Sequence, residues 1–172
     1  MKTTKTKVVN LTLTLFIDQR GRVLFGYKTR KVCRDCWVAP GGHPTKSEMK
    51  RLKGDGLVCA AIRESSEETG LFSENDIKLA GTVFVTVKDK GTRRKIFVFL
   101  TENWIGQLTP DRKEFKELRF FPFERIPWCQ MLPGDPEWIQ LMLQRKLRVD
   151  AKIICGRDRR DFQSMNIKLS PL

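Results

Sequence analysis

The chain has no long hydrophobic run. None of its apolar stretches approaches the roughly 20 residues that cross a bilayer as a helix. The first ten residues also lack the apolar segment of a secretory signal. Internal repeats, low-complexity tracts and linkers are absent as well. We therefore expect a cytoplasmic protein without a membrane partner, with residues 1–172 forming one domain.

The number of cysteines is odd, so they cannot all be paired within the chain. Five cysteines do not make the pattern of a small disulfide-bonded domain, which favours a reducing compartment. Cys33 and Cys36 form a C-x-x-C pair, and His43 follows shortly after it. A zinc site would need two more well-spaced ligands, and the flanking sequence is not that of a thioredoxin-like turn. We expect two reduced thiols near a loop.

Acidic residues are outnumbered. The chain has 33 lysines and arginines against 20 aspartates and glutamates, a net charge of +13. A basic surface attracts polyphosphates, follows a nucleic-acid backbone, or simply keeps the protein soluble. Aromatic residues are not interleaved with the basic residues along the sequence, which weakens the case for a platform that stacks single-stranded bases. The charge predicts a nucleotide substrate, with a nucleic-acid partner through the basic surface as a further candidate.

Hydrophobic periodicity predicts both strands and helices. In residues 8–17, Leu11, Leu13 and Leu15 alternate with polar residues, as in a half-buried strand, and a turn at 18–21 joins this strand to 22–27 in a hairpin. Further strands are expected at 80–87, 94–100 and 119–123, with two weak strands within 151–169. The expected helices are 56–69, burying Val58, Cys59 and Ile62, and 136–146, burying Trp138, Leu141 and Met142. These elements favour an α+β sandwich.

A cluster of acidic residues dominates the first of these helices. Glu64, Glu67 and Glu68 stand at i, i+3 and i+4 and therefore share one helical face. Three carboxylates on one face repel each other, and the usual reason to keep them together is a hard divalent cation such as Mg²⁺. Arg63 lies four residues before Glu67, where it neutralises part of the cluster. Gly70 is placed to end the helix as a left-handed cap.

The order of these residues resembles the signature of the Nudix hydrolases. The signature is a glycine, five residues, a glutamate, seven residues, and then Arg-Glu-aliphatic-x-Glu-Glu-x-Gly-aliphatic. The matching positions are Arg63, Glu64, Glu67, Glu68, Gly70 and Leu71, whereas Ser65 replaces the aliphatic residue. Arg63 lies 21 positions after Gly42, where the signature has 14, so seven residues are extra. Glu48 and Asp55 both compete for the upstream acidic position. We choose Asp55, with residues 43–54 as a lengthened loop.

The resemblance implies a Nudix α/β/α sandwich, with a mixed sheet between helices, that cleaves phosphoric anhydride bonds with Mg²⁺ or Mn²⁺. It makes Glu67 and Glu68 metal ligands, and Glu64 a ligand or an orienting residue. Gly42 belongs to the implied metal site, and its backbone, like that of Gly41, can approach metal and phosphates closely. The alternative for both glycines is a plain turn after Pro40.

The implied catalytic set contains Glu64, Glu67 and Arg63, together with a further glutamate outside the signature. The segment from 114 to 120 resembles the loop that supplies this residue in the family. We choose Glu114, with Glu117 as the second choice.

Outside the signature the chain resembles, over nearly its full length, the MutT-type hydrolases of oxidised purine nucleoside triphosphates. This implies conversion of substrates such as 8-oxo-dGTP to a nucleoside monophosphate and pyrophosphate. Trp37 matches the aromatic residue of the base pocket, and a core position is the alternative. Asp135 matches one of the two pocket acids, and an N-cap before Pro136 is its alternative. Trp37, Gly41, Asp135 and Lys28 form the predicted substrate-binding set.

The chain departs from that base pocket at three positions. Val38 stands where the family has an asparagine, Gly134 replaces one acid, and Leu132 replaces a tryptophan. Two other functions therefore stay open. One is a Nudix hydrolase for another diphosphate-linked substrate, such as an RNA 5′-triphosphate end or a nucleoside diphosphate derivative. The other is a non-catalytic regulator that binds nucleotides or RNA. The sequence leaves the preferred base and the oligomeric state open.

Overall fold

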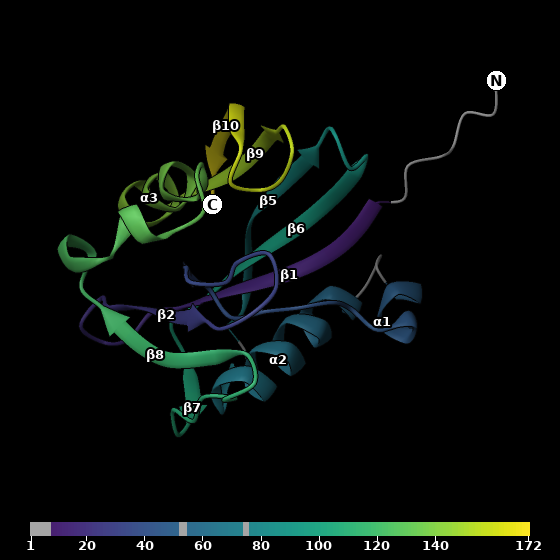
Figure 1. Cartoon of the computed structure of the whole chain (residues 1–172). Coiled ribbons are helices and arrows are strands. Elements are labelled where there is room, and N and C mark those ends of the chain that lie inside the picture. Colours follow the sequence, from purple (N-terminus) through teal and green to yellow (C-terminus); the bar gives the residue numbers. More distant parts are fainter. Residues whose placement is uncertain (1–7, 52–54, 74–75) are drawn as a thin grey trace.

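A five-stranded mixed sheet is the centre of the fold. The computed structural model describes residues 8–51, 55–73 and 76–172. The strand order is β1-β6-β5-β9-β10 (Figure 1). The bounds in that order are Val8–Phe16, Thr92–Thr101, Lys78–Val87, Leu147–Cys155 and Phe162–Pro171. β1 is parallel to β6 and β5 is parallel to β9, whereas β5–β6 and β9–β10 are antiparallel pairs. The predicted mixed sheet is confirmed.

Two smaller sheets extend the structure. β2 (Val23–Lys28) lies between β3 (Trp37–Val38) and β8 (Phe115–Phe121), and β4 (Leu71–Ser73) pairs with β7 (Trp104–Gly106). The predicted hairpin of the first two strands is wrong, because β1 and β2 belong to different sheets and only the Ile17–Val23 bridge joins them. This divergence directs β2 away from the main sheet, and Lys28 at its end reaches the acidic helix.

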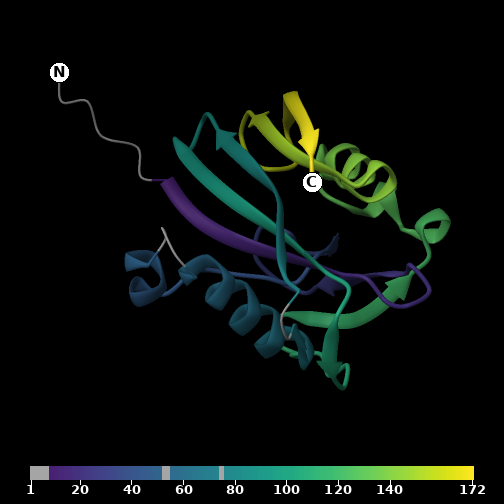
Figure 2. The same ribbon diagram turned by 180° about the vertical axis from the view of Figure 1, so that it is seen from behind.

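One helix packs against each face of the main sheet. α2 (Gly56–Thr69) packs along β1, and α3 (Asp135–Arg145) packs against β9. Leu15 of β1 lies in one core cluster with Trp138 of α3, whereas the next residue, Phe16, lies in a second cluster with Leu71. Successive β1 side chains therefore enter two different layers. The result is the predicted α+β sandwich (Figure 2).

The buried face of α2 differs from the predicted one. Val58, Cys59 and Ile62 are only partly buried. The helix residues that are buried are small or polar instead: Gly56, Ala60, Ala61, Ser65, Glu68 and Thr69. Short side chains let the helix approach β1 closely, so hydrophobicity alone does not mark this face. Gly70 ends the helix with φ 76°, as expected of a left-handed cap.

The segment expected as a lengthened loop contains a short helix. α1 (Lys46–Lys50) begins at Thr45, whose hydroxyl accepts from the Glu48 N–H at 3.2 Å, while the Glu48 carboxylate accepts from the Thr45 N–H at 2.7 Å. This reciprocal capping box gives a five-residue helix a defined start. Residues 52–54, at the end of the predicted loop, lie outside the described residues.

Helix α3 begins after a left-handed glycine. Gly134 is the N-cap, with φ 89°, and Asp135 is the first helical residue, so the predicted N-cap at Asp135 is wrong by one position. Before it lie two 3₁₀ turns, η1 (Phe123–Arg125) and η2 (Trp128–Gln130). α3 buries Trp138, Ile139 and Met142, with Leu141 only partly buried.

The cysteines are dispersed. All five are free, including Cys33 and Cys36, which lie in one tight turn where the Cys36 N–H donates to the Cys33 carbonyl at 3.1 Å. Burial raises the pKa of the Cys33 thiol to about 11, so this thiol forms a thiolate poorly. None of the helices in the described ranges has the length and apolar content that crossing a bilayer would require.

Candidate active site

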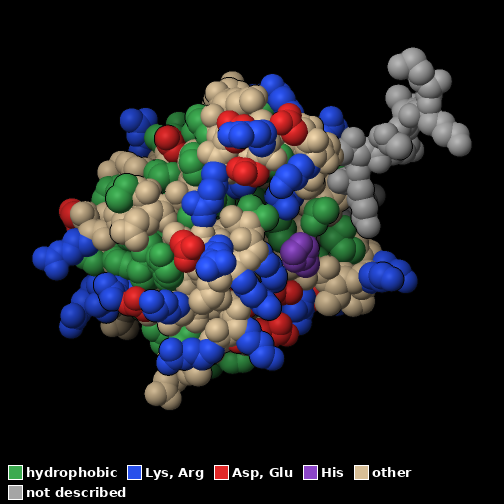
Figure 3. Space-filling model, viewed as in Figure 1, with side chains coloured by type: hydrophobic (Ala, Val, Ile, Leu, Met, Phe, Trp, Pro, Cys, Tyr) green, Lys and Arg blue, Asp and Glu red, His purple; other side chains and the backbone are tan. Residues whose placement is uncertain are grey.

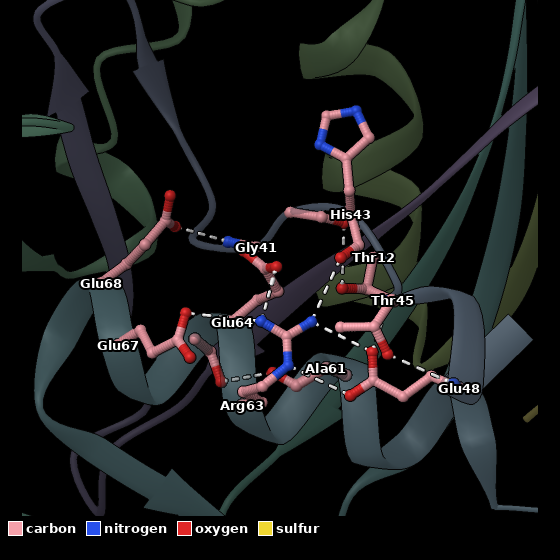
Figure 4. Close-up of polar contacts among 12 residues, drawn as sticks. Thr12, Gly41, His43, Thr45, Glu48, Ala61, Arg63, Glu64, Glu67 and Glu68 are labelled. Carbon is pink, nitrogen blue, oxygen red and sulfur yellow. Dashed lines mark hydrogen bonds and ion pairs between the residues drawn. The ribbon is translucent and has the colours of Figure 1, made fainter.

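Arg63 organises the acidic face of α2. Its guanidinium donates to Glu64 at 2.8 Å, and a second contact reaches Glu67 at 3.4 Å (Figure 4). It also donates to the His43 carbonyl at 3.1 Å. A guanidinium has five donors in a fixed plane, so it can hold several carboxylates at once. The predicted partnership of Arg63 with the acidic cluster is thus present in the structure.

Glu48, and not Asp55, is the upstream acidic partner of Arg63. The Arg63 Nε and a terminal nitrogen lie 3.1 and 3.0 Å from the two Glu48 carboxylate oxygens, a bidentate pair (Figure 4). Asp55 is exposed and instead faces Arg51 at 3.5 Å. The choice of Asp55 is therefore wrong. α1 accommodates the extra residues and returns Glu48 to the face of α2.

Glu48 is strongly stabilised as a carboxylate. Only 6% of the residue is exposed. Hydrogen bonds from Arg63, helped by those from Thr45, lower the pKa of Glu48 to about 2, against the opposing effect of burial. The residue is therefore ionised throughout the neutral range and acts as an anchor for Arg63.

The helix accommodates Ser65 at the position where the family signature has an aliphatic residue. It is fully buried, and its hydroxyl donates to the Ala61 carbonyl at 2.7 Å. The hydroxyl thus finds an acceptor one turn earlier in the helix, as buried serines in helices commonly do. The substitution leaves Glu64 and Glu67 on the same face of α2.

Gly41 and Gly42 bring the backbone directly against the acidic face. The Gly41 N–H donates to Glu68 at 2.8 Å, and the Thr12 N–H of β1 donates to the Gly42 carbonyl at 2.8 Å. A Cβ on Gly42 would lie 2.0 Å from a Glu64 carboxylate oxygen, and a Cβ on Gly41 would lie 2.0 Å from the Thr12 carbonyl. The turn therefore lies directly against the carboxylates, and any side chain here would displace Glu64 or β1.

Lys28 joins two acids that are far apart in sequence. Its ammonium lies 3.3 Å from Glu68 and 2.9 Å from Glu114. Burial lowers the pKa of Lys28, but the two carboxylates outweigh it and the net pKa is raised. Burial also raises the pKa of Glu68, against the effect of Lys28 and the Gly41 N–H. Lys28 therefore stays charged and holds the far end of the acidic cluster.

Glu114 is the glutamate that joins the cluster from outside α2. It is 8% exposed and pairs with Lys28, with Arg30 through Nε at 2.9 Å, and with Lys31 at 3.0 Å. Burial raises its pKa, but these three cations outweigh burial and lower it to about 2. Glu117 lies within β8 and pairs with Arg119, away from the cluster. Arg30 and Lys31, which the sequence did not single out, complete a basic rim around this acid.

One cavity connects these groups to an aromatic pocket. It has a volume of about 400 Å³ and reaches from α2 to α3. One part is lined by Lys28, Gly41, Gly42, Glu64, Glu67, Glu68 and Glu114, and another by Trp37, Met131, Leu132, Asp135, Trp138 and Arg159. Of the ten site residues that the sequence predicts, nine line this cavity, and the tenth, Arg63, lies behind the cluster.

Trp37 and Asp135 combine pocket and structural positions. Trp37 is 7% exposed and contacts Tyr27 and Phe121 edge to face at centroid distances of 5.4 and 4.8 Å. The Trp138 indole N–H donates to Asp135 at 3.0 Å, and Arg159 donates to the same carboxylate oxygen at 2.5 Å. Burial raises the pKa of Asp135, and Arg159 and Trp138, which lower it, offset only part of this rise.

Arg159 is the residue of the pocket that sequence reasoning missed. It is 5% exposed, lies between β9 and β10, and also donates to the Pro133 carbonyl. No local pattern marks it, because it is one of many basic residues in the tail and reaches Asp135 from 24 positions away. A buried arginine is costly unless it is paired, so Arg159 and Asp135 depend on each other.

The acidic cluster supplies the oxygen donors that a hard divalent cation prefers. Within the described ranges, no three His, Cys, Asp or Glu side chains converge as a ready metal site. Arg63 forms ion pairs with Glu64 and Glu67, and Lys28 forms one with Glu68, so each of the three carboxylates is paired with a positive side chain. The donor set consists of oxygens only, and the glycine turn places no side chain against Glu64, so the site fits a hard divalent cation such as Mg²⁺.

Comparison with known proteins identifies the family. The NUDIX domain pattern matches residues 9–143. The chain is a Nudix hydrolase. It is 32% identical over 136 residues to the oxidized purine nucleoside triphosphate hydrolase of Danio rerio, covering 79% of this chain and 80% of that protein. It is 29% identical over 135 residues to the protein of the same name from Mus musculus, covering 78% and 80%.

Solved structures agree on the fold of this Nudix hydrolase. The mutator MutT protein of Bacillus halodurans superposes with a TM-score of 0.77 at 21% identity, covering 93% of this chain and 97% of that one. The MutT protein of Methanosarcina mazei Go1 gives a TM-score of 0.61 at 19% identity, covering 82% and 94%. These two structures therefore share the fold of the chain, and Nudix hydrolases generally use divalent metal ions.

Proposed function

We propose that this Nudix hydrolase converts purine nucleoside triphosphates, oxidised forms such as 8-oxo-dGTP included, to the nucleoside monophosphate and pyrophosphate with Mg²⁺. The continuity of one cavity from the acidic cluster to the aromatic pocket supports this most. A molecule that carries a flat base and a polyphosphate has the two parts that such a cavity needs. The two vertebrate relatives named as oxidized purine nucleoside triphosphate hydrolases support the same substrate class.

Metal binding falls to the carboxylates of α2. Glu64, Glu67 and Glu68 would hold Mg²⁺, which would neutralise phosphate oxygens and acidify a bound water. Arg63 keeps Glu64 and Glu67 on the cavity side of the helix, and Glu48 anchors Arg63 from behind. Glu67, with 62% of its side chain exposed, is the most accessible of the three to an incoming ion.

Without substrate, Glu114 is held as a carboxylate by its three cationic partners. A carboxylate with a pKa of about 2 has little affinity for a proton at neutral pH. Its three cationic partners, Lys28, Arg30 and Lys31, would bind phosphate oxygens at the rim of the cavity. Lysines and arginines spread over the face shown in Figure 3 would add a general attraction for polyphosphates.

The base would lie between the apolar walls of the pocket. Trp37 and Trp138 provide aromatic surface, and Asp135 provides a carboxylate for N–H groups of a purine. One Asp135 oxygen already accepts from Trp138 and Arg159, so the other oxygen is the one suited to a base. Arg159 holds this carboxylate in place.

We place the enzyme in the cytoplasm, since all five cysteines are free.

A hydrolysis screen with product identification tests the proposed substrate and reaction. Purified protein with Mg²⁺ would be offered normal and oxidised purine triphosphates, dinucleoside polyphosphates, sugar nucleotides and triphosphorylated RNA. We expect monophosphate and pyrophosphate from the purine triphosphates. The variant Asp135→Asn should have a higher KM and an unchanged kcat. Cleavage of RNA ends or sugar nucleotides alone would discard the proposed substrate while keeping the metal chemistry.

A further inference from the structure

One face of the main sheet, turned away from the substrate cavity, carries aromatic and basic side chains in register. Phe84 of β5 lies between Lys95 of β6 and Lys152 of β9. In the next row toward one end, Thr82 pairs with Phe97. In the next row toward the other end, Arg93 pairs with Thr86. We call these three rows the open face.

The open face is not part of either hydrophobic core. Val83 and Val85 are buried in the main cluster, so Phe84 between them points to the opposite side of the sheet. Phe84 and Phe97 are partly exposed, and within the described ranges neither packs into either cluster. α2 lies along β1, and in Figure 2 no helix overlaps the upper parts of β5 and β6.

Two further observations concern the shape and the charge of the open face. A hollow of about 340 Å³ is lined by Phe84, Thr86, Lys152, Ile153 and Ile154. The charge of the open face is positive. Strand register places five basic residues on the three rows and on the same face of β9 and β10 beside them: Arg93, Lys95, Arg148, Lys152 and Lys168. The acidic residue among them is Asp150, which pairs with Arg148 at 3.4 Å. The Lys95 ammonium lies 4.9 Å from the centroid of the Phe97 ring.

We infer that the open face binds single-stranded nucleic acid. Two aromatic rings beside cations match the alternation of flat bases and phosphates along one strand. Phe84 and Phe97 stack on unpaired bases, and Arg93, Lys95 and Lys152 bind the backbone. Paired bases cannot stack in this way, which excludes a duplex as the preferred ligand. The sequence hides this surface because sheet pairing, and not chain order, interleaves the aromatic and basic residues.

This inference is independent of the hydrolytic activity and is tested by binding alone. A fluorescent 20-nucleotide strand of mixed sequence is titrated in anisotropy measurements at several salt concentrations, free and annealed to its complement. We expect tighter binding of the single strand, with an affinity that falls as salt rises. Phe84→Leu with Phe97→Leu should weaken binding at least about fivefold without changing the salt dependence. Lys95→Gln with Lys152→Gln should reduce the logarithmic salt slope by about 0.7 for each lost phosphate contact.

A charge-matched control decides whether the surface is specific. Lys113→Gln with Lys116→Gln removes the same charge from exposed positions near β8 and should leave the affinity nearly unchanged. Equal losses in both lysine pairs would show that binding follows net charge only and would overturn the inference. So would preference for the duplex, or full affinity in the leucine variant. A concentration-dependent dimer that the leucine variant abolishes would assign the face to a second copy instead. Unchanged melting temperatures establish that each variant is folded.

Discussion

At the scale of single residues, the site is a balance of charges. Four glutamates, Glu64, Glu67, Glu68 and Glu114, line one cavity, and each carries a positive partner. Arg63 serves two of them and Lys28 serves the other two. This pairing lets the protein keep carboxylates together before a metal arrives, because an isolated cluster of like charges would destabilise the fold.

Removing the charge of Glu67 should separate catalysis from stability. We expect Glu67→Gln to lower kcat by about 100-fold or more, because a neutral amide is a weaker ligand for Mg²⁺. Its melting temperature should stay within about 2 °C of the parent, since most of the side chain is exposed. Steady-state kinetics and thermal unfolding check both points. Glu117→Gln, outside the cluster, is the matched control and should keep full activity.

The pair of Arg159 and Asp135 should show strong coupling. Arg159→Met leaves a buried carboxylate without its cation and should cost about 3 kcal/mol of unfolding free energy. Asp135→Leu alone should also destabilise, and the double variant should recover part of the loss. Urea unfolding of the four proteins measures the coupling. Simple additivity of the two single changes would contradict a mutually dependent pair.

At the scale of elements, α1 restores a contact that an insertion would otherwise break. The extra residues between Gly42 and Arg63 fold into a capped helix that returns Glu48 to Arg63. The insertion is therefore accommodated outside the acidic face of α2. Arg63 thus keeps an acidic partner from outside α2, in addition to its contacts with Glu64 and Glu67 within the helix.

The Glu48 anchor predicts a defined pH dependence. Its pKa is about 2 in the folded protein against an ordinary value of 4.5. The contribution to stability is therefore complete above about pH 4.5 and is lost as the pH falls toward 2. Glu48→Gln should cost about 1–3 kcal/mol near pH 7, and the difference from the parent should shrink at pH 3. Denaturant unfolding at both pH values checks this. Asp55→Asn should change stability by less than about 0.5 kcal/mol at either pH.

At the scale of the whole molecule, two separate sheets and two helices meet around one cavity. The divergence of β2 from β1 brings Lys28 to α2, and the turn before β10 brings Arg159 to α3. The cavity is thus assembled from both ends of the chain. No single element contains a functional site by itself.

Metal binding should stabilise the entire fold. A ligand that binds only the folded state raises the melting temperature with its concentration. We expect 10 mM MgCl₂ to raise the melting temperature by several degrees, because the carboxylates that would bind Mg²⁺ converge only in the folded protein. NaCl of equal ionic strength is the control and should give a clearly smaller shift. A shift of the same size in Glu67→Gln would argue against a site on α2.

Removal of the metal should also stop the reaction. Chelation with EDTA should abolish hydrolysis, and added Mg²⁺ should restore it.

The local pattern of the sequence determined much of this protein. The alternation in residues 8–17, the i, i+3, i+4 acids and Gly70 are short-range features, so β1, α2 and its cap could be predicted from the chain alone. The order of Arg63, Glu64, Glu67 and Glu68 also identified the family. Glu114 lines the cavity, and its catalytic role stays a prediction; its three cationic partners could not be read from the sequence.

Only the tertiary structure decided the remaining points. Spacing allowed both Glu48 and Asp55, and the capped helix α1 selected Glu48. The buried face of α2 consists of small and polar residues, which have no hydrophobic signature. Arg159 and the open face depend on strand pairing between residues distant in the chain. The physical reason is common to all of these: a pattern in sequence reports contacts within a few residues, whereas long-range pairing follows from packing of the complete chain.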